Sequence, residues 1–317
     1  MKVLLFVFFI ALVLALLIPF VFIPRTITFS KIAYIKTNSN VAARFITNRS
    51  AWQSWWPHPK KIYRNNAHNS DAGIFHFRNA SFSPNSSGFD RVGVAITTTY
   101  AVLNSTLKVL PLNKDSIAIE WEAAMPEAFN PVNRIRYYFF ARHLKHEMAD
   151  ILTSLKDFSQ NTENVYGIAI REAKVKDTLL VSTKFTSIKY PSTASIYTAI
   201  NQLKEYIKLN GAEETNYPML HIKANGFGFE TMSAIPVNKA VPPGKNFLIK
   251  RMIPGKILVA EVKGGSYSTA NALKQLDTFL DDNQFRSPAI PFESLVTDRS
   301  VEKDTSRWLT KIYYPIY

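Results

Sequence analysis

The second half of this chain contains an internal repeat with a spacing of 73 residues. The shift lays AINQLKEYIKLNG, residues 199–211, over ALKQLDTFLDDNQ, residues 272–284, with apolar and amide positions in register. Each copy has the pattern of a strand, a helix and two strands, and the copies end alike in AIPV and YYPI. We therefore expect two βαββ units, at about 176–238 and 246–317. A cleft between two such units is a common ligand site.

Three further segments belong to this pattern: GKILVAEVKGGSYS, PFESLVTD and WLTKIYYPI. Together with the repeat they resemble the GyrI-like effector-binding domain, which is also the drug-sensing module of AraC- and MerR-type regulators. The resemblance covers almost all of 166–317. It implies that a small hydrophobic or cationic molecule binds between the repeats, around a buried glutamate that the motif places at Glu293. Family members commonly read WE.Y..DP, whereas this chain has Phe292 before the glutamate, Leu295 for the tyrosine and Arg299 for the proline.

Glu293 lies in IPFESLV, an otherwise apolar strand. Burial disfavours an ionised carboxylate unless a cation or a hydrogen-bond donor meets it. A cationic ligand would supply that partner, and aromatic side chains would add cation–π attraction. Alternatively, Glu293 faces water on an edge strand, since Ser294 and Thr297 nearby are also polar.

Three aromatic residues complete the expected ligand site. The resemblance places Tyr267, at the start of the second repeat's helix, near the ligand. Trp308 and Tyr313 lie on the expected last strand, where one face covers the core and the other is free to line the cleft. The predicted ligand-binding residues are therefore Glu293, Tyr267, Trp308 and Tyr313.

The N-terminus carries the longest apolar run. Val3 to Ile23 has no charged residue, and 21 helical residues span the hydrocarbon core of a bilayer, about 30 Å thick. The run is longer than the apolar region of a signal peptide and no A-x-A-like site follows it. We expect a single-pass membrane anchor over 1–24. Basic residues lie on both flanks, so the side of the membrane that the rest of the chain occupies stays open.

Residues 25–163 have the pattern of an antiparallel sheet closed by a long helix. RTITFSKIAYIKT and several runs between 60 and 122 alternate apolar and polar residues, and residues 38–50 form a capped helical segment. From Pro131 to Phe158 there is no helix breaker, and an apolar stripe recurs at helical spacing. These features, with the motifs W..WWP and NP..RI.YY, resemble the helix-grip domains of the SRPBCC (START-like, polyketide cyclase-like) superfamily. The expected fold class is α+β: an anchor, a helix-grip domain over 25–163 and a duplicated GyrI-like domain over 164–317.

The segment AWQSWWPHP, residues 51–59, suggests either a ligand cage or a packed core. Trp52, Trp55 and Trp56 are spaced i, i+3 and i+4, so they share one helical face. The expected sheet and long helix give that face a core to enter, with the indole N–H groups bonded to local acceptors. We predict core packing.

Other residues narrow the possible chemistry. The chain has no cysteine, which excludes thiol nucleophiles and thiolate metal sites. The net charge of +14 is spread along the chain without a basic run, and we expect no nucleic-acid partner. HLKHEMAD, residues 143–150, does not match a zinc-protease helix, and we interpret His143, Glu147 and Asp150 as a solvated polar face. No metal or cofactor is expected.

The leading hypothesis is a membrane-tethered protein that binds a small hydrophobic or cationic molecule around Glu293. The alternative is a small-molecule hydrolase, with Glu293 as general base and Tyr267 or Tyr313 as proton donor. A third possibility, an inhibitory or scaffolding partner of another protein, is less compatible with an anchored chain.

Overall fold

The computed structural model describes residues 6, 20–57 and 73–317. The chain divides into two compact units, with the boundary between Asn161 and Thr162. Most of the predicted anchor, and His58 and Pro59 of the tryptophan segment, lie outside the described residues. Within the part of the chain that is described, no helix is both long enough and apolar enough to cross a membrane.

The first unit is built on an antiparallel sheet of six strands in the order β1-β6-β5-β4-β3-β2. The strands are β1 (Thr28–Ile35), β2 (Phe75–Phe77), β3 (Ala80–Ser87), β4 (Arg91–Thr98), β5 (Val102–Asn113) and β6 (Ser116–Ala124). Their burial alternates along β4 and β5, as expected of strands with one face on a core. Within the alternating region between 60 and 122, the segments GIFHFRNASF (73–82) and GVAITTTYAVLN (93–104) each contain a turn between two strands and so form hairpins.

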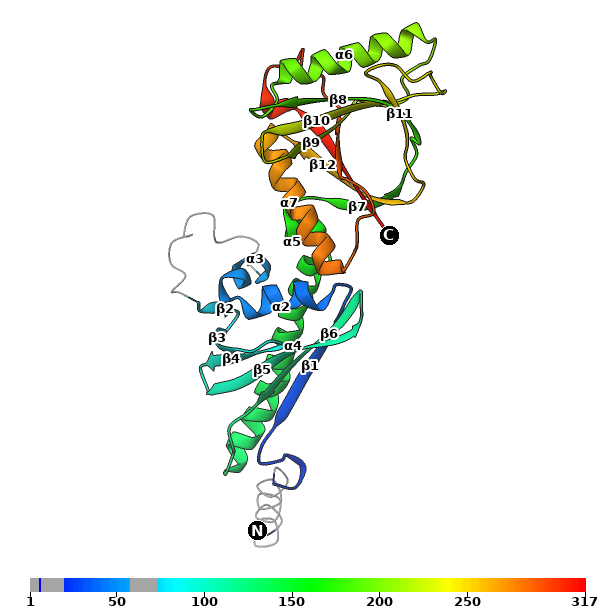
Figure 1. The fold of residues 1–317 in the computed structure, drawn as a ribbon. Helices are drawn as coiled ribbons and strands as arrows, with labels where there is room; N and C mark the ends of the chain where they lie inside the picture. The colour runs from blue at the N-terminus through cyan, green and yellow to red at the C-terminus, as the bar shows by residue number, and fades with distance from the viewer. Residues whose placement is uncertain (1–5, 7–19, 58–72) are drawn as a thin grey trace. The chain divides into compact units, whose positions relative to one another are not determined.

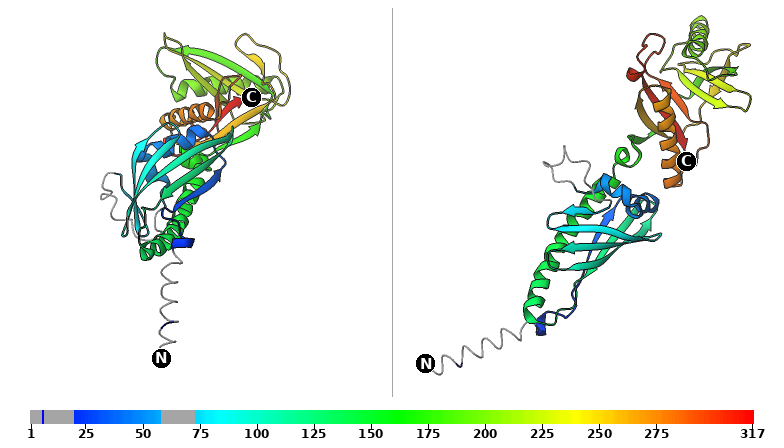
Figure 2. Two further views of the ribbon diagram at one scale, coloured as in Figure 1. Left: turned by 90° about the horizontal axis from the view of Figure 1, so that it is seen from below. Right: turned by 90° about the vertical axis from the view of Figure 1, so that its left-hand side faces the viewer.

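The long helix α4 (Pro131–Ser159) lies across one face of this sheet, as Figures 1 and 2 show. It begins where predicted, because Pro131 suits the first helical turn and the side chain of Asn130 accepts a hydrogen bond from the Asn133 backbone at 2.7 Å. Its apolar stripe, which includes Leu144, Met148 and Ile151, is buried. Shorter helical segments complete the unit: α2 (Ser39–Thr47), η1 (Arg49–Ala51) and α3 (Trp52–Trp55).

The tryptophan cluster is part of the core of the first unit, which confirms the prediction. Trp52, Trp55 and Trp56 are 0%, 2% and 4% exposed. Their rings lie within 5.6 Å of one another, centroid to centroid. Each indole N–H donates to a backbone carbonyl: Trp52 to Ile46 at 2.7 Å, Trp55 to Phe45 at 3.0 Å and Trp56 to His76 at 3.0 Å. With every donor used within the fold, the cluster presents no polar group to a ligand.

The second unit contains an antiparallel sheet of eight strands in the order β11-β8-β10-β9-β13-β14-β12-β7. The first repeat comprises β8 (Leu179–Ser187), α6 (Thr193–Leu209), β9 (Met219–Ala224) and β10 (Phe229–Pro236). The second comprises β12 (Lys256–Lys263), α7 (Ser266–Asn283), β13 (Phe292–Leu295) and β14 (Leu309–Ile316). The predicted βαββ pattern is thus confirmed in both copies. The unit also contains α5 (Thr162–Tyr166), β7 (Ile170–Lys174), β11 (Leu248–Arg251) and η2 (Thr305–Arg307).

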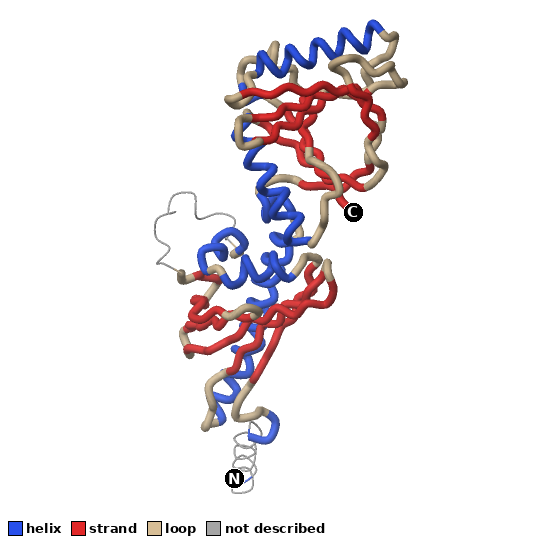
Figure 3. The backbone as a smooth tube through the Cα atoms, in the orientation of Figure 1, coloured by secondary structure: helices blue, strands red, loops and turns tan. Residues whose placement is uncertain are grey.

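The eight-stranded sheet curls round, and α6 and α7 both lie on its outer side (Figures 1 and 3). Ile200 and Leu203 of α6 pack with Ile235 of β10 in one core. Leu276 of α7 packs with Ile312 of β14 in a second core. Each helix therefore buries the outer face of its own repeat. The chain is α+β with antiparallel, curved sheets, and the inner face of the second sheet is left without a covering helix.

Candidate functional site

The two faces of β13 lead to two different environments. Glu293 pairs with Leu220 on β9 and Ile312 on β14, both of which belong to the cores beneath the helices. Because paired residues of an antiparallel ladder share a face, Glu293 points to the outer, helix-covered side. Phe292 pairs with Tyr313, and their stacked rings, 5.1 Å apart, lie on the inner side.

On the outer face, the carboxylate of Glu293 is met by an internal cation. Arg299 Nη2 lies 3.4 Å from Glu293 Oε2 and donates to Thr310 Oγ1 at 2.8 Å. The side chains of Arg299 and Glu293 are only 7% and 16% exposed. The Arg299 guanidinium also lies over the Trp308 ring, 4.8 Å from its centroid.

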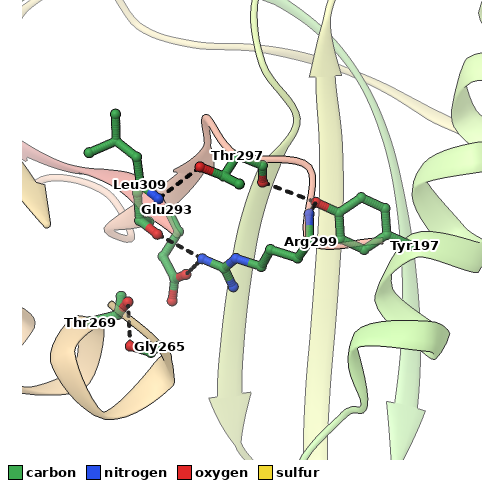
Figure 4. A network of polar contacts seen from close by, with 8 residues as sticks. Tyr197, Gly265, Thr269, Glu293, Thr297, Arg299 and Leu309 are labelled. Carbon is green, nitrogen blue, oxygen red and sulfur yellow. Dashed lines mark hydrogen bonds and ion pairs between the residues drawn. The ribbon is translucent and has the colours of Figure 1, made fainter. Parts of the chain in front are cut away.

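A hydrogen bond between the backbone of Arg299 and the side chain of Tyr197 holds Arg299 in this position. The Arg299 N–H donates to Tyr197 Oη at 2.7 Å, and that hydroxyl in turn donates to the Thr297 carbonyl at 3.3 Å. Figure 4 shows Arg299 extending from Tyr197 on α6 toward Glu293, with Gly265 and Thr269 at the start of α7 nearby. Arg299 thus contacts residues of both repeats, Tyr197 of the first and Glu293 of the second.

Burial raises the pKa of Glu293 above its ordinary value, and the positive charge of Arg299 offsets part of that increase. The same carboxylate helps to raise the pKa of Tyr190, for which burial is the larger cause. A partner for the Glu293 charge is therefore already present within the fold. The carboxylate does not require a cationic ligand to be tolerated in its strand.

The four residues predicted to contact a ligand do not form one site. Glu293 and Trp308 are connected through Arg299, and the Trp308 indole N–H donates to the Glu302 carbonyl at 3.0 Å. Tyr267 is 88% exposed on the first turn of α7. Tyr313 lies on the inner face of the sheet, opposite to Glu293.

A cavity of about 490 Å³ lies on the inner side of the curled sheet. Its wall includes strand residues of the first repeat and residues of the second repeat, together with the β11–β12 connection. The apolar residues lining it are Val175, Leu180, Met219, Leu220, Met232, Ala234, Met252, Ile253, Pro254, Pro288, Ala289, Ile290, Phe292, Pro315 and Ile316; of these, Leu220 and Ile316 also belong to the cores beneath α6 and α7. The cavity is thus predominantly apolar and lies between the repeats.

The inner space continues beyond this cavity. An adjoining hollow of about 350 Å³ shares Val175, Met219, Met252 and Phe292 with it. Two backbone hydrogen bonds fix the β11–β12 connection to the segment between β7 and β8. Val175 N donates to the Gly255 carbonyl at 3.0 Å, and Met252 N donates to the Thr178 carbonyl at 2.8 Å. The connection therefore forms a wall of the cavity.

The sequence contained a signal for this inner cavity that motif reasoning missed. β10 reads FETMSAIP, in which Ile235 packs under α6 while Met232 and Ala234 on the opposite face line the cavity. A strand in an antiparallel sheet with water on one side alternates apolar and polar residues. Apolar residues on both faces, without a second layer of helices in the sequence, indicate an enclosed inner space.

In the first unit, the interpretation of 143–150 as a solvated polar face is wrong for one residue. Glu147 is 2% exposed, and burial raises the pKa of its carboxyl. His143 Nε2 lies 3.3 Å from Glu147 Oε1, and Asp150 pairs with Arg78 at 2.8 Å. Glu147 is adjacent to the buried Met148, and it lines a hollow with Tyr100 of the β4–β5 turn and Phe140 of α4. Nowhere in the described chain do three or more metal-ligating side chains gather.

Comparison with known proteins gives only distant structural likenesses. No protein-family model and no curated protein matches the chain. The C-terminal domain of EcmrR is 18% identical, with 47% of this chain and 98% of that chain covered and a TM-score of 0.41. EcmrR in its complex with DNA is 19% identical, with coverages of 59% and 71% and a TM-score of 0.43. SAV2435 bound to tetraphenylphosphonium is 11% identical, with coverages of 47% and 93% and a TM-score of 0.32. At these scores the likenesses carry no argument about this chain.

Proposed function

We propose that this protein binds a small lipophilic molecule, and that the ligand occupies the inner cavity between the two repeats of the second unit. The supporting observation is the apolar cavity of about 490 Å³. Ligand sites in proteins commonly have volumes of about 300–1,000 Å³, apolar walls and a few polar groups. The expected location between the repeats is retained, but the proposed site lies on the face of β13 opposite to Glu293.

The composition of the wall supports a ligand site over an imperfectly filled core. Met219, Met232 and Met252 line the cavity, and methionine side chains adapt to ligands of irregular shape because they are flexible and polarizable. Two further lining residues, Ile253 and Ile290, are 83% and 48% exposed. A group of exposed apolar side chains at a concave surface is more typical of a binding site than of the rest of a protein surface.

The outer face offers less support for a ligand or a reaction. Arg299 supplies the cation that a ligand was expected to bring to Glu293. For the hydrolase alternative, Tyr313 lies on the other face of the sheet, and Tyr267 is 88% exposed and forms no hydrogen bond with Glu293 in the described part of the chain. We therefore propose a structural role for Glu293 and favour binding over catalysis.

The remaining proposals rest on the sequence. We propose that residues 1–24 anchor the chain in a membrane as a single span, and that the two units belong to the SRPBCC and GyrI-like classes that their motifs resemble. The absence of a nucleic-acid partner also stays a prediction.

The neutral fluorescent probe N-phenyl-1-naphthylamine tests the proposed function. We expect saturable binding to the full chain, and weakened binding to Ala234→Phe, because the added ring fills the cavity that Ala234 lines. Ala224→Phe is the matched control, since Ala224 is exposed near the end of the neighbouring strand β9. All three proteins share the apolar N-terminus, so its contribution to probe fluorescence cancels. Equal binding by the wild type and Ala234→Phe would place the probe elsewhere and refute the proposal.

A further inference from the structure

One lysine that lines the apolar cavity, Lys250, forms no ion pair with a carboxylate of the described residues. Lys250 lies on β11, the edge strand next to β8, and its side chain is partly buried. Its Nζ lies 3.0 Å from the sulfur of Met232 on β10, on the far side of β8. The lysine side chain therefore crosses the inner face of β8 and brings its ammonium group to the cavity wall.

A thioether is a poor partner for an ammonium group, because its sulfur is only a weak acceptor. Within the described chain, no carboxylate oxygen lies within 4 Å of Lys250 Nζ. A charged group held against an apolar wall gains free energy from a counter-ion that shares its environment. Lys250 is thus placed to receive an anionic group from the contents of the cavity.

The other charges around the cavity favour the same ligand. The described residues that line it include the cations Lys250, Arg251 and Lys256 and no acidic residue. In the adjoining hollow, Glu172 is paired with Lys256 at 3.2 Å, and Asp177 accepts a hydrogen bond from Asn216 at 2.8 Å. These two carboxylates are thus already engaged, and among the described side chains that line the cavity Lys250 and Arg251 are cations for which no acidic side chain lines the wall.

We propose that the ligand is a single-chain amphipathic anion, with its hydrocarbon chain in the cavity and its carboxylate on Lys250 Nζ. This inference rests on the proposed function, because it assigns a chemical class to the occupant of the same cavity. It differs from the cationic ligand that the family resemblance implies. That difference has a basis in the sequence, since Arg299 neutralises the family's glutamate and Lys250 provides a cation on the opposite face.

The test compares three ligands that share one hydrocarbon chain: dodecanoate, dodecan-1-ol and dodecyltrimethylammonium, each kept below its micelle concentration. Each displaces N-phenyl-1-naphthylamine from the full chain, and we expect dodecanoate to bind most tightly and the ammonium compound most weakly. Lys250→Met is expected to weaken dodecanoate binding about tenfold or more, the effect of losing one charge-assisted hydrogen bond. Dodecan-1-ol binding should change by less than about twofold, since the cavity itself is preserved.

Two further variants make the result specific. Lys245→Met removes the same charge from the exposed segment before β11, outside the residues that line the cavity, and should leave dodecanoate binding unchanged. Lys250→Arg keeps the cation and should retain most of the affinity. If none of the three ligands displaces the probe from the wild type, the proposed function fails. If dodecan-1-ol binds, but dodecanoate shows no advantage or Lys250→Met does not reduce it, the function stands and the anionic ligand is refuted.

Discussion

Replacing Arg299 by methionine tests the role assigned to the outer-face ion pair. The substitution keeps much of the side-chain volume but removes the cation 3.4 Å from Glu293 Oε2 and the donor to Thr310 Oγ1. Removing one partner of a buried ion pair commonly costs about 3–5 kcal/mol, because the remaining charge is left uncompensated. We expect the lower end of this range, about 3 kcal/mol at pH 7, because Glu293 can take up a proton instead of staying charged.

The cost should depend on pH in a definite direction. The folded-state pKa of Glu293 is raised above the ordinary glutamate value of about 4.3, and the loss of Arg299 raises it further. A carboxyl with a raised pKa stabilises the folded state fully below its unfolded pKa, and the contribution is lost as the pH rises through the folded pKa. The destabilisation by Arg299→Met should therefore be small near pH 4 and increase toward pH 7.

Native-state hydrogen exchange is the suitable assay, because it reports the second unit separately in a chain of two units. The free energy of opening is measured on peptides of β13 and β14 for Arg299→Met, Glu293→Gln and the double variant. Glu293→Gln removes the charge that Arg299 compensates, so the double variant should be more stable than the two single effects predict, by about 2 kcal/mol.

Arg307→Met is the matched control. Arg307 also pairs with acidic residues, Glu302 and Asp304, but its side chain is 71% exposed. Exposed ion pairs contribute about 0–1 kcal/mol. If Arg299→Met costs no more than Arg307→Met, or if the Arg299 and Glu293 effects are additive, then Arg299 does not compensate the glutamate and the argument for a ligand on the inner face loses a premise.

Three further outcomes follow from the first unit. Trp52→Ala should cost about 3–5 kcal/mol, because a fully buried indole and its hydrogen bond to Ile46 are lost; thermal melting that is unchanged would contradict the assigned core. Asn38→Ala should cost about 1 kcal/mol, since the Asn38 side chain caps α2 by accepting from Val41 N at 2.9 Å, and exchange of the α2 amides measures it. Glu147→Gln should make the stability of this unit less dependent on pH, because the raised pKa of Glu147 implies a stability contribution that is lost as the pH rises above about 4.3; an unchanged pH profile would place Glu147 in water.

Local sequence patterns predicted most of the secondary structure because each signal depends on near neighbours. Helix α4 begins at Pro131 behind its Asn130 cap and follows one apolar stripe, and the repeat predicted both βαββ units. The tryptophan spacing placed all three indoles in one core for the same reason. Turns inside two alternating runs were missed, since a tight hairpin adds few residues to the pattern; at Arg78 a positive φ of 51° closes one of them.

The site was less predictable because it depends on residues far apart in the chain. The cavity wall is assembled from residues between Val175 and Tyr317, and only the curvature of the sheet shows that they meet. The pairing of Glu293 with Arg299 was not anticipated, although Arg299 was visible in the sequence as a departure from the motif that the chain resembles. The face that each residue takes decided the rest, because a shift of one residue along β13 moves a side chain from the outer, helix-covered face to the inner cavity.

The most direct test of the account is a crystal structure of the full chain with ω-brominated dodecanoate, located by the anomalous signal of the bromine. The account predicts a bromine peak inside the cavity lined by Met219, Met232 and Phe292, and a ligand carboxylate within about 3 Å of Lys250 Nζ. A bromine peak between α6 and α7 beside Glu293, with the inner cavity unoccupied, would contradict it.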